Sequence, residues 1–429
     1  MNININFEDL FNQEPPKLLV SCSKDPNDTA KTEGLYIVDF KSNNISKVLD
    51  ADCGGIVSYN NGYFLATNSH GILNLDKDFN IVAQHEVPYL DVHGLKMDSN
   101  SLLYLAESTH NTIGIYQPEP FKRVDEIKIS EHDFDYNHIN DLWIEGNRLF
   151  VSMFSYHDAW RELDGVYDGV ILEYNLEEKA LVNILQKNLM FPHSVTIFNE
   201  SLHYCDSLNL NLKKDNEVLA QFSGFTRGLA FDGWNYYVGQ STMRHVNRVL
   251  VNHKNVSIDH GIHIFNPYRS TNRFLPLPAK QIYEILIINQ EFYETSTLSS
   301  KVEMKDPLSI KYLNSPKDWH EPEQNYRWMA STRAGVKLYS NQPVFNLSIN
   351  AHNYYSSDYS ANVFINNKII GEIRFNQNGS NTFHFKLTEP LEGNISIFFE
   401  VQNLWSPSRV IGNNDERNLG IAIEKIFLF

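Results

Sequence analysis

The sequence predicts an all-β chain in which a six-bladed β-propeller is followed by a jelly-roll-like β-sandwich. One short phrase, two small, polar or charged residues and then an apolar one, occurs six times, and strand-like runs follow it. Its copies start 39, 47, 53, 34 and 56 residues apart, which straddles the roughly 40 to 50 residues of a four-stranded blade. The copies are Gly54-Gly55-Ile56, His93-Gly94-Leu95, Asn140-Asp141-Leu142, His193-Ser194-Val195, Arg227-Gly228-Leu229 and Tyr283-Glu284-Ile285.

The two ends of this repeat region predict how the ring closes. Residues 18–22, 34–40 and 47–49 read as the second, third and fourth strands of a blade without an inner strand. The missing inner strand appears at residues 283–288. Joining the two ends closes a ring of six blades and removes exposed strand edges.

Beyond the repeats, the pattern predicts a boundary and a second domain. We assign the propeller to residues 1–290 and a proline-containing linker to residues 291–325. Residues 326–429 alternate short strands with Asn, Gly and Ser turns, which is typical of a β-sandwich.

Composition and charge exclude several classes of function. The 429 residues carry a net charge of −16, which opposes binding to nucleic acids and to anionic membranes. No apolar stretch is long enough for membrane insertion and no leader is recognised, so we expect a cytoplasmic protein. The three cysteines have no ligand spacing, and the sequence lacks phosphate-binding glycine motifs, so no nucleotide cofactor is expected.

The repeats also predict a site, because equivalent positions of all blades meet around one end of the central channel. The candidate catalytic residues there are His93, His193, Glu107, Asp206 and Asp141. Candidate substrate-binding residues come from the phrases, from the ends of second strands and from two insertions, residues 154–168 and 241–260, that rise over the same end. They are Arg227, Asn140, His138, Gln240, Tyr156, Trp160, Arg161, Arg244 and His245.

The residue types suggest two kinds of chemistry and one structural alternative. His93, His193 and Glu107 could hold a divalent metal ion, because neutral imidazoles and carboxylates are common ligands. Arg227 could bind a substrate carboxylate. The alternative is that these groups only hydrogen-bond buried water in the channel.

Phrases such as Phe191-Pro192-His193-Ser194 and Arg227-Gly228-Leu229-Ala230 resemble a bacterial family of uncharacterised six-bladed propellers. In architecture the array is distantly similar to gluconolactonases, and in residue chemistry to propeller-type pectate and oligogalacturonate lyases. The last hundred residues resemble β-sandwiches that accompany surface-polysaccharide assembly proteins, through Arg327-Trp328-Met329, Trp405-Ser406-Pro407 and Gly412–Gly420.

Together these features favour a carbohydrate-active protein of bacterial surface-glycan biosynthesis or modification, with lyase or hydrolase chemistry on an acidic sugar. The alternative is a non-catalytic glycan-binding or scaffold protein that partners a glycosyltransferase. A signalling propeller is disfavoured, because protein recognition prefers apolar and aromatic rims.

Overall fold

The computed structural model describes residues 15–25, 29–88, 91–162, 167–198, 200–244, 246–249, 253–267, 269–288, 300–306, 309, 312–353, 359–375 and 379–429. The chain divides into two compact units, Met1–Phe292 and Tyr293–Phe429. Within the described ranges, no helix is long and apolar enough to cross a membrane.

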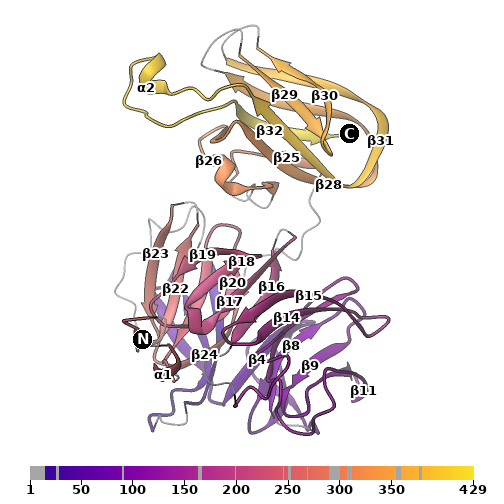
Figure 1. Cartoon of the computed structure of the whole chain (residues 1–429), viewed down its shortest axis with the longest axis vertical. Helices are drawn as coiled ribbons and strands as arrows, with labels where there is room; N and C mark the ends of the chain where they lie inside the picture. Colours follow the sequence, from indigo (N-terminus) through magenta and orange to yellow (C-terminus); the bar gives the residue numbers. More distant parts are fainter. Residues whose placement is uncertain are drawn as a thin grey trace. The chain divides into compact units, whose positions relative to one another are not determined.

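The first unit consists, in its described part, of six four-stranded antiparallel sheets arranged as propeller blades (Figure 1). In chain order the blades after the first are β4–β7 (Cys53–Tyr59, Gly62–Thr67, Gly71–Leu75, Ile81–His85), β8–β11 (Val92–Met97, Leu103–Glu107, Thr112–Pro118, Phe121–Lys128), β12–β15 (Ile139–Glu145, Arg148–Met153, Gly169–Asn175, Ala180–Leu189), β16–β19 (Pro192–Phe198, Ser201–Asp206, Asn211–Lys214, Glu217–Gln221) and β20–β23 (Phe225–Phe231, Tyr236–Ser241, Gly261–Asn266, Thr271–Pro276).

The remaining blade joins the two ends of the unit, as the sequence predicts. Its inner strand is β24 (Gln281–Ile288), which pairs with β1 (Lys17–Ser23), and β2 (Gly34–Asp39) and β3 (Asn44–Leu49) complete the sheet. The inner strands β24, β4, β8, β12, β16 and β20 each contact the next, and β20 returns to β24. The six-bladed all-β fold class is therefore confirmed.

Each repeated phrase coincides with a β-bulge in an inner strand. The pairing register shifts between Cys53 and Ile56, between Val92 and Leu95, and at the corresponding place in the other inner strands. A bulge leaves residues out of the ladder and redirects their side chains. The residues so displaced include His93, Asn140, Arg227 and Tyr283.

Small residues in the phrase allow neighbouring inner strands to approach closely. A Cβ on Gly55 would lie 2.6 Å from the carbonyl oxygen of His93, and one on Gly94 would lie 2.9 Å from the Cα of Asp141. Such distances are too short for a side chain. The glycines are thus required by strand-to-strand packing around the channel.

The two insertions pack together over blades four to six instead of projecting separately. Trp160 and Met243 belong to one buried apolar cluster with Phe154 and Phe191. The Tyr167 hydroxyl donates a hydrogen bond to the Arg248 carbonyl, linking the first insertion to the second. The second insertion contains the one-turn helix α1 (Val246–Val249).

The second unit is one large, strongly bent β-sheet, consistent with a sandwich. Its longest strands, β28 (Arg333–Asn353) and β31 (Gly379–Val401), pair along two stretches separated by register shifts near Val344. The other elements are β25 (Lys301–Glu303), β26 (Trp319–Pro322), β27 (Arg327–Met329), β29 (Ser360–Ile365), β30 (Lys368–Arg374), β32 (Ala422–Leu428) and the short helix α2 (Pro407–Val410).

Part of the expected linker, residues 291–325, belongs to this sheet. The strand β25 pairs with β32, and β26 pairs with β27. These strands were not predicted from the sequence, because each is a short run close to a proline. Trp328 and Trp405 pack edge to face in the interior, with ring centroids 5.7 Å apart, so they form core and no exposed stacking platform.

Candidate functional site

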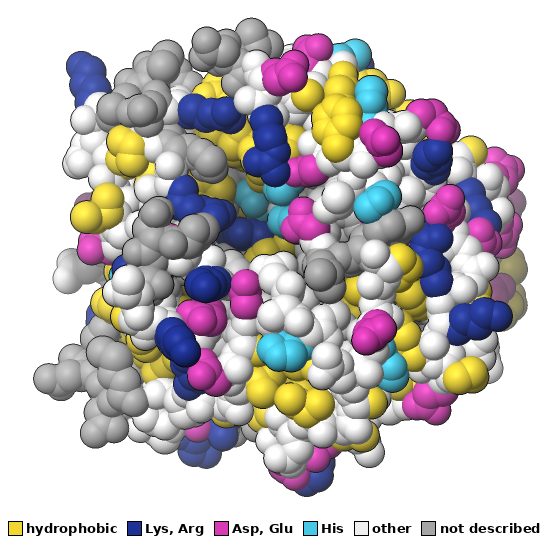
Figure 2. All heavy atoms as spheres, turned by 90° about the horizontal axis from the view of Figure 1, so that it is seen from below, with side chains coloured by type: hydrophobic (Ala, Val, Ile, Leu, Met, Phe, Trp, Pro, Cys, Tyr) yellow, Lys and Arg dark blue, Asp and Glu magenta, His cyan; other side chains and the backbone are white. Residues whose placement is uncertain are grey.

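A polar cavity of about 470 Å³ opens at the end of the propeller channel where the bulges lie. Figure 2 shows a hollow in which dark-blue Lys and Arg atoms lie beside cyan His atoms. The described residues that line it all carry a polar or charged group. They are Ser23, Lys24, Asp52, Asn68, Asp91, His93, Arg227, Arg244 and Tyr283.

Two arginines face this cavity without a carboxylate partner among the described residues. Arg227 is 4% exposed, and its Nε has no hydrogen-bond partner. Partial desolvation and the neighbouring charge of Arg227 lower the pKa of Arg244, and Asp25 offsets only part of this. A buried guanidinium and a second cation nearby repel each other, so an anion placed between them would be stabilised.

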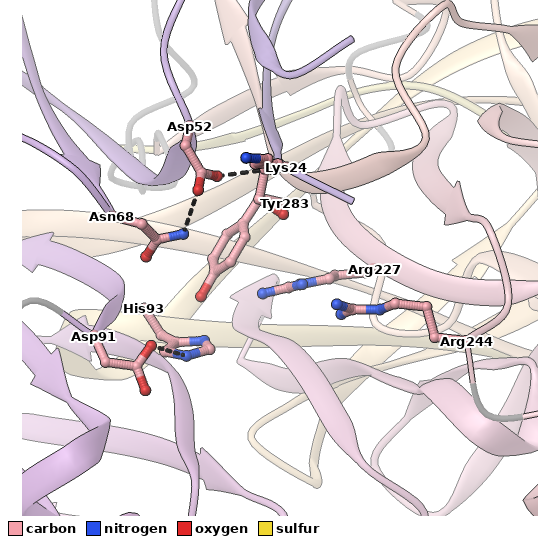
Figure 3. Close-up of a pocket in the computed structure, with 9 residues that line it drawn as sticks. Lys24, Asp52, Asn68, Asp91, His93, Arg227, Arg244 and Tyr283 are labelled. Carbon is pink, nitrogen blue, oxygen red and sulfur yellow. Dashed lines mark hydrogen bonds and ion pairs between the residues drawn. The ribbon is translucent and has the colours of Figure 1, made fainter. Parts of the chain in front are cut away.

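Tyr283 lies between the arginines and the histidine side of the cavity (Figure 3). Its ring centroid is 3.5 Å from the guanidinium carbon of Arg227, a cation–π contact. Burial raises the pKa of the Tyr283 phenol, although the Arg227 charge opposes this, so the group is a proton donor near neutral pH. The hydroxyl makes no hydrogen bond of ordinary geometry within the described chain.

His93 and Asp91 form a hydrogen-bonded pair at the opposite side of the cavity. His93 Nε2 is 3.1 Å from Asp91 Oδ1, and His93 Nδ1 is 3.2 Å from Asn140 Oδ1. Burial alone would raise the pKa of Asp91, but the hydrogen bond from His93 and the nearby imidazoles lower it. Both ring nitrogens of His93 contact protein oxygens, so His93 orients Asp91 and could accept a proton from a ligand only after one of these contacts is broken.

A second group of charges lies on the inner strands. Lys96 forms a salt bridge with Glu284, whose other oxygen accepts a hydrogen bond from the Ile56 amide at 2.8 Å. Burial and the Glu284 charge raise the pKa of Asp141 to about 7, while Lys96 and Arg227 oppose the shift. Asp141 therefore occupies the channel wall as a carboxyl group that titrates near neutrality.

The predicted acids Glu107 and Asp206 lie outside the cavity. Glu107 is fully buried in its own blade, where it pairs with Arg123 at 2.7 Å and accepts a hydrogen bond from Thr112. Asp206 accepts hydrogen bonds from the Met190 amide and from Asn209. Both residues lie at the ends of second strands, one strand away from the channel axis, so their side chains form hydrogen bonds and ion pairs within their own blades.

His193 and Gln240 are likewise bound within the blades. His193 Nδ1 lies 2.9 Å from the Phe191 carbonyl oxygen and 2.8 Å from Ser207 Oγ. Burial and the Arg227 charge lower the pKa of His193 well below its usual value, so it is neutral. Gln240 bonds to His263 at 3.0 Å and to the Asp259 carbonyl.

Several residues predicted to bind substrate above the cavity instead form hydrogen bonds with Asp135 and thereby fix the first insertion in place. The Asp135 carboxylate accepts hydrogen bonds from Trp160 Nε1 at 2.8 Å, from Arg161 at 3.0 Å and from His138 at 2.9 Å. Burial lowers the pKa of His138, whose ring lies 4.7 Å from that of His93. Tyr156 packs on the apolar cluster of blades three and four, and His245 lies outside the described residues.

The predicted metal site is not assembled in the described part of the chain. No three His, Cys, Asp or Glu side chains there are close enough to share an ion. Glu107 is held by Arg123, and His193 is held by the Phe191 carbonyl and Ser207. The residues present do not fit a divalent ion at His93, His193 and Glu107.

Sequence reasoning identified His93, Arg227 and Arg244 among the cavity residues but gave no role to Asp91, Asp52 or Lys24. These three precede or follow inner and second strands at the same channel end. The signal that would have found them is position: each lies within a few residues of a phrase or of the first strand.

No family model matches the chain, and no curated protein matches it. Solved structures resemble it distantly. A protein of unknown function from Bacteroides caccae has a TM-score of 0.47 at 12% identity, covering 64% of this chain and 100% of its own. A putative gluconolactonase has a TM-score of 0.40 at 11% identity, covering 65% of this chain and 84% of its own. The calcium-binding protein regucalcin from Agrobacterium tumefaciens has a TM-score of 0.42 at 10% identity, covering 56% of this chain and 83% of its own. Likeness at this level carries no functional argument.

Proposed function

We propose that this protein binds an acidic carbohydrate, with the acid group held between Arg227 and Arg244 at the channel mouth. The observation that carries the proposal is the pair of cations lining one cavity without a carboxylate partner in the described chain. The predominance of polar and charged side chains in the described lining supports a hydrophilic ligand, and the volume lies in the range typical of small-molecule sites.

Calorimetric titration with D-glucuronate and D-glucose tests this proposal. We expect glucuronate to bind and glucose to bind at least tenfold more weakly. Arg244→Ala should weaken glucuronate binding about 10- to 100-fold, because a charge-assisted hydrogen bond contributes roughly 1.5–3 kcal/mol. The matched control is Arg148→Ala, on an exposed arginine paired with Glu173. Equal binding of both sugars, or an unchanged Arg244→Ala variant, would refute the proposal.

A second candidate, lyase or hydrolase chemistry on the same ligand, is favoured by the Tyr283 hydroxyl. An arginine bound to a carboxylate makes the adjacent C–H more acidic, and a protonated phenol can donate to a leaving oxygen. The proton acceptor would be His93 after a substrate displaces Asn140.

If the reaction is a lyase reaction, oligogalacturonate should yield an unsaturated product, detected by ultraviolet absorbance. Hydrolysis would instead yield only new reducing ends. Tyr283→Phe should abolish turnover and retain binding.

Binding without turnover would instead support the glycan-binding or scaffold role. The resemblance of the C-terminal unit to sandwiches of surface-polysaccharide assembly supports a place in bacterial glycan biosynthesis, with a glycosyltransferase as partner in the cytoplasm.

A further inference from the structure

Apart from Lys24, which lies beside Asp52, the charged donors and the acceptors of the described lining lie on different sides of the cavity (Figure 3). On one side, Arg227 and Arg244 offer only donors (Figure 3). On the other, Asp52, Asp91 and the Asn68 carbonyl oxygen offer acceptors. A ligand that fills the cavity must therefore present an anion at one end and hydrogen-bond donors at the other.

The acceptor side is held in place and retains free capacity. Asp52 accepts from the Lys24 amide at 2.7 Å and from Asn68 Nδ2 at 3.1 Å, and this second bond turns the Asn68 oxygen away from Asp52. Asp91 accepts from His93 at 3.1 Å. A carboxylate has about four acceptor positions, so each retains lone pairs for a ligand.

Charge indicates that the donor end consists of hydroxyls. Among the described lining residues, leaving His93 out of the count, three cations (Lys24, Arg227 and Arg244) stand against two carboxylates (Asp52 and Asp91). This leaves a surplus of one positive charge, on a protein whose net charge is −16. One carboxylate neutralises that surplus, whereas a ligand that also carried an ammonium would restore it.

We infer that the site selects a polyhydroxy monoacid, reading its hydroxyls with Asp52 and Asp91 while the arginines hold its carboxylate. This rests on the proposed function and adds the second recognition element. An acid of similar ring size without hydroxyls would satisfy the arginines and leave both carboxylates without ligand donors.

The test compares D-glucuronate with cyclohexanecarboxylate on the full chain by calorimetric titration. The wild-type protein should bind glucuronate at least tenfold more tightly, and Asp52→Asn should reduce that ratio about tenfold. The ratio cancels the general electrostatic effect of removing one charge. Asp50→Asn is the control, because Asp50 is exposed and does not line the cavity. If Asp52→Asn fails to fold, Asn68→Ala serves the same purpose.

The outcomes separate the inference from the function beneath it. Equal affinities for the two acids, or a ratio unchanged by both Asp52→Asn and Asn68→Ala, would overturn hydroxyl recognition and leave the arginine site intact. Failure of both acids to bind would overturn the proposed function itself.

Discussion

The pKa of the Asp141 carboxyl group is set by its burial and by the charges along the channel wall. Burial and Glu284 raise its pKa to about 7, and Lys96 compensates only in part. In the unfolded chain the same group has a pKa near 3.9. Between these values the folded state holds a proton that the unfolded state has released, so stability falls as pH rises from about 4 to 7.

Asp141→Asn should remove this loss. The amide keeps an oxygen for the Leu142 N–H, now 2.9 Å from Oδ1, and carries no charge. We expect the free energy of unfolding at pH 8 to rise by roughly 1–3 kcal/mol, since one pKa unit corresponds to about 1.4 kcal/mol. Urea denaturation at pH 5 and pH 8 measures it. Asp78→Asn, on an exposed residue, is the control, and a variant less stable than the parent at pH 8 contradicts this assignment.

Residue type alone predicted some of the residues that line the cavity, but it also pointed to residues that lie outside it. His93 and Arg227 displaced by bulges do line the cavity, whereas Glu107, at the end of a second strand, is bound to Arg123 inside the blade. Strand alternation determines which way such a side chain points, and a single sequence does not show whether a neighbouring arginine already occupies it. Asp91 was missed because it lies two residues before the phrase, outside the repeated positions.

At the scale of strands, the bulge explains why one phrase serves both fold and site. In each inner strand the register breaks at the phrase, and at Gly55 and Gly94 the missing side chain leaves room for the adjacent inner strand. The displaced neighbour is free to differ from blade to blade, as His93, Asn140, Arg227 and Tyr283 do. Repetition of the backbone thus permits variety in the side chains that meet at the channel mouth.

Gly94→Ala should destabilise the protein by about 1–3 kcal/mol, the usual cost of overpacking. The new methyl would lie 2.9 Å from the Asp141 Cα and 3.2 Å from the Leu142 nitrogen, so two inner strands must separate. Chemical denaturation measures the change. Gly54→Ala, whose methyl would have its nearest atom at 3.3 Å, should cost less; an equal cost at both positions would argue against strand approach as the cause.

Across the whole propeller, stability depends on joining residues 17–23 to residues 281–288. Ile282 and Ile285 of β24 are fully buried in one cluster with Leu18 and Val20 of β1 and with Tyr237 of β21. Closure was predictable because the first repeat lacked an inner strand and the last had only an inner strand. The second unit was less predictable, because its long strands bend and pair twice, so local pattern did not reveal their length.

Ile285→Ala tests the closure. Removing a buried isoleucine side chain costs about 2–5 kcal/mol in a well-packed core. We expect a loss in that range and a single cooperative transition at lower denaturant concentration. Ile81→Ala, on an outer strand where the side chain is 53% exposed, should change stability little. A loss below about 1 kcal/mol for Ile285→Ala would mean that the joining strand contributes little.

The central claim is that bulged inner strands bring Arg227, Tyr283 and His93 to one cavity, in which Arg227 and Arg244 hold an anion. A crystal structure of the full chain soaked with D-glucuronate tests it most directly. We predict that the carboxylate lies within hydrogen-bonding distance of Arg227 and Arg244, with the hydroxyls toward Asp52 and Asp91. Glucuronate bound elsewhere on the protein, with this cavity holding only solvent, would contradict the claim.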